Sequence, residues 1–442
     1  MNIQLSDHFT YKKLLKFTIP SICMMIFTSV YGVVDGFFVS NFVGKTPFAA
    51  VNFIFPFLMM FGAVGFMFGT GGSALIAKTM GEGNKQKANK YFSLFIYVTL
   101  LIGVVISILG IIFIRPIASF LGAEGELLDN SVIYGRILLC AIPFLILQFE
   151  FQSFFVTAEK PQLGLITMIV AGVTNMAFDA LLTAVFPCGI VGAAVATALS
   201  QVMGGGIPLI YFLRKNNSLL RLGKTELDGK ALLKASTNGM SELLSNISMS
   251  VVSMLYNLQL IKYVGENGVA AYGTLMYVNF MFLSISIGFV VGSAPIVSYH
   301  YGAGNTDELR GLKNKSTTII VIASFIMLIS AILLAKPLSS VYVGYDKELY
   351  ELTVRAFYIY SFSFLFAPLA IYGSSFFTAL NDGLVSAIIS FLRTLIFETA
   401  AVLILPIFLQ VDGIWLATVI AEFSAAAVTV IFIITKRKKY KY

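Results

Sequence analysis

The stretch LLKFTIPSICMMIFTSVYGVVDGFFVSNF, residues 14–42, is apolar over almost its whole length and contains only two charged side chains, Lys16 and Asp35. An α-helix needs roughly 20 apolar residues to cross the hydrocarbon core of a bilayer, and this stretch is longer than that. It therefore predicts a helix that spans a membrane and carries one carboxyl group inside it.

The rest of the chain repeats this pattern. Of the 442 residues, 58% are hydrophobic and 12% are charged, whereas a soluble domain has about 25% charged residues. Most of the chain must therefore lie in lipid, which favours an all-α membrane protein. The sequence predicts twelve spanning helices, at residues 14–42, 47–77, 91–114, 131–156, 161–186, 189–213, 232–262, 269–299, 316–335, 351–379, 384–408 and 412–435.

Basic residues are distributed unevenly between the loops. The two termini and the loops that follow even-numbered helices hold 22 Lys and Arg residues, and the opposite loops hold 5. Positive loops face the cytoplasm, so we expect both termini to be cytoplasmic and the chain to lie in the plasma membrane. This bias also explains the net charge of +8 without a nucleic-acid partner. Residues 1–13 are polar and basic, and we expect no cleaved signal peptide.

Short motifs recur at a nearly constant spacing. Three pairs match in the same order along the chain: GEGN at 81–84 with GAGN at 302–305, SFF at 153–155 with 375–377, and GI at 189–190 with 413–414. Such a regular recurrence indicates an internal repeat.

An even number of helices per repeat implies parallel repeats related by a pseudo-two-fold axis along the membrane normal. We expect one six-helix bundle over residues 1–213, a cytoplasmic connector over 214–231 and a second six-helix bundle over 232–442. A cavity between the bundles would hold the substrate, and rocking of one bundle against the other would expose it to either side.

Three polar residues inside predicted helices are the main candidates for function. Ionisable groups cost free energy in a membrane and usually face the protein interior. Asp35 lies in the first helix, and Asn175 and Asp179 lie one turn apart in the fifth, on one helix face. Carboxylate and amide oxygens suit a hard cation such as Na⁺, and a carboxyl group can bind H⁺ instead. The alternative is a polar clamp between helices.

Other side chains are candidates for a substrate pocket or a structural role. A proline removes a backbone hydrogen bond, so Pro20 predicts a bend in the first helix. Glu398 and Glu422 lie in the last two helices, where local pairing explains them as well as function does. Methionine side chains adapt to varied ligands, although packing explains any single one equally well. The candidates for the pocket are Glu150, Gln152, Glu242, Met59 and Met276.

The sequence lacks the motifs of several other classes of protein. Residues 69–72 (GTGG) resemble a Gly-rich loop, but the Gly-Lys-Ser/Thr of a P-loop does not follow, so we expect no ATP hydrolysis. The three cysteines and two histidines are scattered, which argues against a zinc site or a disulfide framework. We therefore expect neither an enzyme nor a resident cofactor.

Together these features resemble the multidrug and toxic compound extrusion (MATE) family. The resemblance rests on the arrangement of six plus six helices, on Ile19-Pro20-Ser21 followed by Asp35, and on residues 81–84. The GIVGAA sequence at 189–194 and GIWLA at 413–417 contribute as well. Residues 31–35 (YGVVD) look most like the bacterial branch that includes staphylococcal multidrug pumps.

The resemblance implies export of amphipathic organic cations, driven by exchange for Na⁺ or H⁺. It implies that the coupling ion binds in the first bundle, at Asp35, Asn175, Asp179 and the hydroxyl of Thr197. Glu242 matches an acidic residue in the seventh helix of some relatives. The acidic residue that some relatives carry in the tenth helix has no counterpart between residues 358 and 380, which disfavours a cation site there.

A flippase for lipid-linked oligosaccharides remains the main alternative. Such a protein would need basic side chains facing its cavity, and the predicted helices hold chiefly Arg136, Arg355 and Arg393, near helix ends. The acidic groups lie deeper, which favours cationic substrates. We expect a monomer that contacts small-molecule drugs or toxic metabolites and the lipid bilayer.

Overall fold

The computed structural model describes residues 3–442, with residues 32, 33, 36, 37, 40, 45 and 266 described by their backbone alone. Throughout this part of the chain the regular secondary structure is helical. The elements are α1 (Tyr11–Phe38), η1 (Val39–Val43), α2 (Lys45–Gly81), α3 (Lys85–Phe120), α4 (Gly125–Thr157), α5 (Pro161–Asp179), η2 (Ala180–Val185), α6 (Gly189–Leu213), α7 (Gly229–Tyr263), α8 (Glu266–Gly302), α9 (Thr306–Val343), α10 (Lys347–Tyr360), α11 (Ser363–Ala379), α12 (Gly383–Phe391), η3 (Leu392–Phe397) and α13 (Glu398–Tyr440).

These helices account for the twelve predicted spans. Within the described residues, nine helical stretches are long and apolar enough to cross a membrane, and the pair α10–α11 makes a tenth. The stretch Gly383–Tyr440 has 58 residues, about 87 Å if straight. It is broken at Gln410, whose φ of 51° and ψ of −128° are not helical, and so crosses twice. Helix α7 has 35 residues and a more polar sequence, and it completes the twelve.

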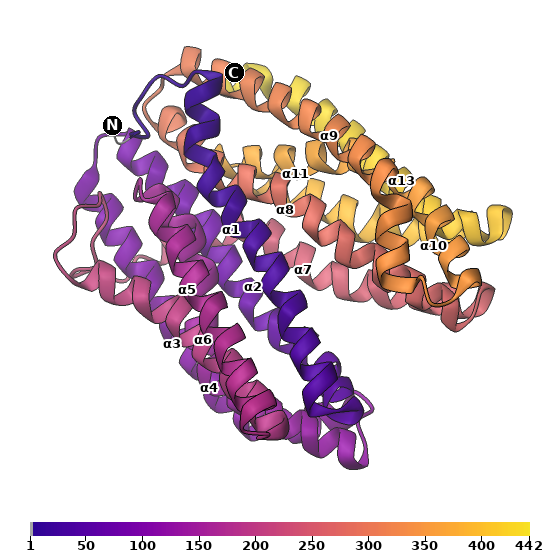
Figure 1. Ribbon diagram of the computed structural model, residues 1–442. Helices are drawn as coiled ribbons and strands as arrows, with labels where there is room; N and C mark the ends of the chain where they lie inside the picture. The colour runs from indigo at the N-terminus through magenta and orange to yellow at the C-terminus, as the bar shows by residue number, and fades with distance from the viewer. Residues whose placement is uncertain (1–2) are drawn as a thin grey trace.

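The helices form two bundles that lie side by side (Figure 1). Helix α4 packs against α2, α3 and α6 in the first bundle, and α11 packs against α8, α9 and α13 in the second. Helices α1 and α2 contact α7 and α8 across the boundary. Both termini lie at one end of the molecule, where the bundles meet, and the bundles spread apart toward the other end. The predicted all-α, two-bundle architecture is confirmed.

The tenth span is not one straight helix. Helices α10 and α11 meet at an angle of 49°, where the sequence predicts a continuous helix over 351–379. At the bend the Ser361 hydroxyl donates a hydrogen bond to the carbonyl oxygen of Phe357, 2.6 Å away, and the N–H of Phe364 donates to the carbonyl of Ser361. Such local bonds compete with the regular α-helical pattern.

Glycines bring the backbones of the two bundles into contact. A β-carbon on Gly71 of α2 or on Gly239 of α7 would overlap the backbone of the opposite helix. The same holds for Gly81 of α2 and Gly302 of α8, which are counterparts in the internal repeat and meet each other's helices in the same way. Small residues allow such close helix approach in membranes.

A short N-terminal strap, residues 5–9, joins the two bundles at the end where they meet. The N–H of Leu5 donates a hydrogen bond to Glu159, in the loop between α4 and α5, at 2.6 Å. The N–H of Phe9 donates to Glu308, in the first turn of α9, at 2.9 Å, and the ring of His8 contacts the same carboxylate. The strap therefore binds one acidic group from each bundle.

Candidate functional site

The candidate site lies in the first bundle, where α1 and α5 pack closely. Gly172 of α5 permits this approach, since a β-carbon there would overlap the ring of Phe27 on α1. Asp35 lies near the end of α1, and Asn175 and Asp179 lie one turn apart at the end of α5. The close packing therefore places the carboxyl group of α1 against the polar face of α5.

Side chains from three helices converge on Asp35. Its Oδ1 atom accepts hydrogen bonds from Nδ2 of Asn175, at 3.2 Å, and from the hydroxyl of Thr197 on α6, at 3.3 Å. Asp179 faces the same carboxyl group closely enough to interact with it. The structure thus brings together the three residues that the sequence singles out and Thr197, which the family resemblance adds.

Asp179 is the unusual member of this group. Its side chain is completely buried, and apart from the facing carboxyl group of Asp35 neither carboxylate oxygen has a hydrogen-bond partner among the described residues. The amide oxygen of Asn175 is also buried and unpaired within that part of the chain. Asp35 is partly buried beside Asp179, and two adjacent carboxylates in such a place are costly to ionise together unless a proton or a cation reduces their charge. The oxygens present therefore fit either H⁺ or a hard cation such as Na⁺.

Both carboxylate-bearing helices change their winding at the site. Helix α5 ends at Asp179, and the π-helical turn η2 begins with the next residue. The carbonyl oxygen of Asp179 accepts a hydrogen bond from the hydroxyl of Thr183, at 2.6 Å. Helix α1 likewise passes into η1 one turn after Asp35. Single π-helical turns occur frequently at functional sites.

Two tyrosines belong to the site although the sequence analysis did not select them. Tyr134 of α4 is completely buried and lies near both Asp35 and Asp179, with its hydroxyl close to Thr197. Tyr31 of α1 lies near Asp35 and contacts Gln148. A tyrosine within an apolar helix is a weak signal, because its ring is accommodated by lipid or by the protein core. Only the fold shows that these hydroxyls lie near carboxylates.

The residues proposed for a substrate pocket lie in separate places. Glu150 is buried inside the first bundle, where it accepts a hydrogen bond from Thr99 of α3 at 2.6 Å. Glu242 is partly buried on α7. Met59 packs against a core cluster of the first bundle and Met276 against one of the second. Their role in substrate binding stays a prediction.

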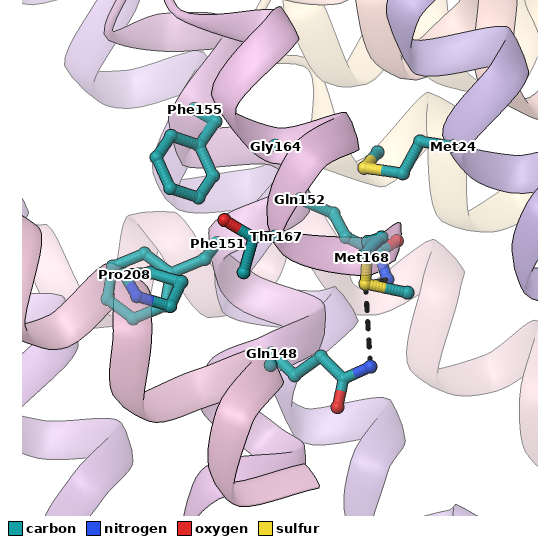
Figure 2. Close-up of a pocket in the computed structure, with 10 residues that line it drawn as sticks. Met24, Gln148, Phe151, Gln152, Phe155, Gly164, Thr167, Met168 and Pro208 are labelled. Carbon is teal, nitrogen blue, oxygen red and sulfur yellow. Dashed lines mark hydrogen bonds between the residues drawn. The ribbon is translucent and has the colours of Figure 1, made fainter. Parts of the chain in front are cut away.

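Gln152 lines a small pocket enclosed by α1, α4, α5 and α6 (Figure 2). The amide nitrogens of Gln148 and Gln152 point to the sulfur of Met168, at 3.4 and 3.9 Å. The amide oxygens of both glutamines are buried, without a partner in the described part of the chain. The pocket has room for roughly one water molecule, too little for an organic cation in this conformation.

Pro20 lies within α1, which the structure describes as one helix from Tyr11 to Phe38. A bend at this proline therefore stays a prediction. In the second bundle Glu422 forms a two-pronged ion pair with Arg393, with distances of 2.8 to 3.0 Å. Glu398 instead accepts hydrogen bonds from hydroxyl groups of Tyr256 and Thr418.

Comparisons with known proteins give a consistent result. The model of the MatE family matches residues 20–181 and again residues 243–404. Multidrug export protein MepA of Staphylococcus saprophyticus is 28% identical over 321 residues, which cover 72% of this chain and 71% of the relative.

Two solved structures share the fold. One is the outward-facing conformation of a multidrug resistance MATE family transporter of the MOP superfamily, with a TM-score of 0.93 and 22% identity over 100% of this chain and 98% of that one. The other is a MOP superfamily transporter from Pyrococcus furiosus, for which the reverse polarity of the binding pocket suggests a different function. Its TM-score is 0.91, with 22% identity and 98% of each chain covered.

Proposed function

The chain belongs to the MatE family, whose model matches both of its halves, and from this premise we propose that it exports amphipathic organic cations in exchange for Na⁺ or H⁺. The membrane is the plasma membrane, with both chain termini in the cytoplasm. The similarity to Multidrug export protein MepA supports the export of drugs.

The observation that carries the proposal is the pair Asp35 and Asp179. Asp179 is fully buried, and in the described chain its oxygens have the second carboxyl group, that of Asp35, as their one possible partner. Burying such a pair is costly unless positive charge arrives with it. The coupling ion supplies that charge when it is bound. The relative free energies of the conformations of this bundle therefore depend on ion binding.

The proposed cycle follows from this dependence. With the ion absent, Asp35 and Asp179 favour a conformation that admits water or a cationic substrate near them. With the ion bound, the pair carries less negative charge and tolerates the closely packed arrangement of α1, α5 and α6 described above. Exchange needs only that each ligand binds the two conformations with different affinity. Alternating access would then come from rocking of the two bundles.

A cationic substrate suits the charges inside the helices. Arg393 is paired with Glu422, and Arg355 is paired with Asp412, so neither guanidinium is left to bind an anionic headgroup. The carboxyl groups of Asp35 and Asp179 lack such partners in the described chain. This balance supports organic cations over lipid-linked sugars. The proposal involves no ATP, catalytic reaction, nucleic acid or resident cofactor, and takes the chain as a monomer.

The test is efflux of ethidium from proteoliposomes with Na⁺ and pH gradients imposed separately. We expect one gradient to drive efflux, and Asp35→Asn and Asp179→Asn to abolish the coupling. Asp129→Asn is the matched control, because Asp129 forms an exposed ion pair with Arg115 and its loss should leave efflux intact. Gradient-driven efflux that persists in both site variants would reject the assignment. Lack of any gradient-driven export by the wild type would favour the flippase instead, with labelled lipid translocation as the next assay.

A further inference from the structure

The second bundle holds a polar cluster that the proposed coupling site does not use. Tyr256 of α7 and Thr418 of α13 are buried, and their hydroxyls lie 2.7 Å apart. One of these hydroxyls donates to the other, which in turn donates to Oε1 of Glu398, 3.4 Å from Tyr256 and 3.2 Å from Thr418. Glu398 follows directly after η3, as η2 follows directly after Asp179 in the first bundle.

This cluster occupies the positions that the internal repeat assigns to the first site. The spacing that relates Gly81 to Gly302 also relates Asp35 to Tyr256 and Thr197 to Thr418. Asn175 and Glu398 stand at the same place in the two matches of the family model, residues 20–181 and 243–404.

In the second bundle the carboxyl group therefore stands at the position equivalent to Asn175 of α5, and not at the position equivalent to Asp35 of α1, while the threonine is kept. Each bundle thus contains a carboxylate that accepts a hydrogen bond from this threonine, Asp35 from Thr197 and Glu398 from Thr418. The second cluster is a rearranged counterpart of the first site.

The charges around Glu398 leave it without a cation of its own. Arg393 lies near but binds Glu422 through both Nε and a terminal nitrogen, so that pair is neutral as a unit. Glu242 faces Arg393 from α7. Arg393 and the two hydroxyl groups favour the ionised form of Glu398, and the charge of Glu422 opposes it. The other titratable groups that face it are tyrosines, Tyr256 of α7, Tyr272 of α8 and Tyr360 of α10.

We propose that Glu398 is a second proton-binding site, located in the second bundle and loaded independently of Asp35 and Asp179. Its carboxylate takes a proton from water when the bundle opens and returns it to water on the other side, while the hydroxyls of Tyr256 and Thr418 reorient to accept or donate. A proton suits the site better than a metal ion, since the cluster offers a single carboxylate and two hydroxyl groups, too few oxygen ligands for a hard metal cation. The role of this proton in transport rests on the proposed function.

The direct test is infrared difference spectroscopy of the purified, reconstituted protein over a pH titration, followed through the carboxyl band. We expect Glu398→Gln to remove one titrating component, and Asp35→Asn to remove a different one. Glu348→Gln is the control, since Glu348 is exposed at the start of α10. Identical titrations of the wild type and Glu398→Gln would overturn the proposal.

Two further variants keep the proposal testable if Glu398→Gln does not fold. Tyr256→Phe and Thr418→Val remove the hydroxyl donors to Glu398 and should move the pH at which the Glu398 component titrates. A titration that is unmoved in both hydroxyl variants would overturn the proposal as well.

A transport measurement separates this proposal from the one on which it rests. Protons moved per ethidium exported should fall by one in Glu398→Gln. Failure of the wild type to export ethidium would remove the proposed function, while the spectral component of Glu398 would stand. An unchanged ratio of protons to ethidium in Glu398→Gln, with the ratio altered in Asp35→Asn, would overturn the role of Glu398 alone.

Discussion

Thr197 contributes one hydroxyl to the coupling site, and its effect can be isolated. The hydroxyl donates to Oδ1 of Asp35 and also to the carbonyl of Ala193. Thr197→Val keeps the size of the side chain and removes the donor to Asp35. We expect this change to shift the affinity for the coupling ion by about 1 kcal/mol, the usual worth of one hydrogen bond. Ethidium efflux measured against the size of the ion gradient would show a midpoint displaced several-fold.

The matched control is Thr70→Val on α2. The described contacts of the Thr70 hydroxyl consist of a bond to the carbonyl of Phe66 in its own helix, so the same loss should leave the midpoint in place. Equal midpoints for the wild type and Thr197→Val would mean that this hydrogen bond does not tune the ion site.

The members of the coupling site could be selected from the sequence because charge in lipid is rare. Asp35 and Asp179 interrupt apolar helices, and Asn175 lies one turn from Asp179. What the sequence could not provide is the absence of donors around Asp179 in the described chain, since this depends on which way neighbouring helices turn their polar groups. Tyr134 was missed for the same reason. Thr197 came from the family resemblance rather than from any pattern of its own.

The packing of α1 on α5 decides whether this site forms. Gly172 provides the space, because a β-carbon there would lie within the ring of Phe27. We expect Gly172→Ala to push the helices apart and to lower stability by about 1–3 kcal/mol, as overpacking usually does. A lowered thermal unfolding midpoint in detergent, together with reduced coupled efflux, would be the result. Gly206→Ala on α6 is the control, because its β-carbon would meet its nearest neighbour, Phe144, only at 3.7 Å.

The order and approximate positions of the helices were predictable, but several helices extend well beyond the predicted ends, as α9 (Thr306–Val343) does beyond the predicted 316–335. Long apolar runs separated by polar loops mark the spans directly. The break at Gln410 falls between the predicted spans 384–408 and 412–435. The bend at Ser361 was missed, because it has no proline or glycine at the bend itself and depends on how the second bundle packs, which the periodicity of the sequence does not report.

The contact between the bundles is nearly self-complementary. Gly81 meets the segment around Tyr299, and Gly302, its counterpart in the repeat, meets the segment around Lys78. A patch related to itself by a two-fold axis forms an interface of this kind. Because the contact is made by backbone on backbone, there is little room for it to adjust. Closure at this end should therefore behave as an all-or-none event.

Gly239→Leu tests this closure. The side chain would collide with the backbone of α2 at Met67, so we expect the two bundles to be held apart at the end with the termini. Spin labels at Lys85 and Arg310, both exposed and in opposite bundles, should show a longer distance. Gly273→Leu on α8 is the control, since no atom lies within 4 Å of the β-carbon position there. An unchanged distance distribution in Gly239→Leu would show that the glycine contact does not limit closure.

The N-terminal strap should favour the same closed arrangement. Glu308→Ala removes the acceptor for the N–H of Phe9 and for His8, and we expect the label distances to shift partly toward the separated state. Asp346→Ala is a matched control, because Asp346 caps α10 through Leu349 within one bundle. A closed population that is identical in Glu308→Ala and the wild type would reject a role for the strap.

The strap also constrains the order of events during synthesis. Phe9 leaves the ribosome early, but its partner Glu308 is made 299 residues later, at rates of about 5–20 residues per second. In the last part of that interval, after Leu213 at the end of α6 has been made, the first bundle can be complete while the strap binds only Glu159. The contacts of the strap with the second bundle can form only when α9 has begun to insert. The newly made first half therefore exists for a time without the contacts that the finished protein must break in order to open.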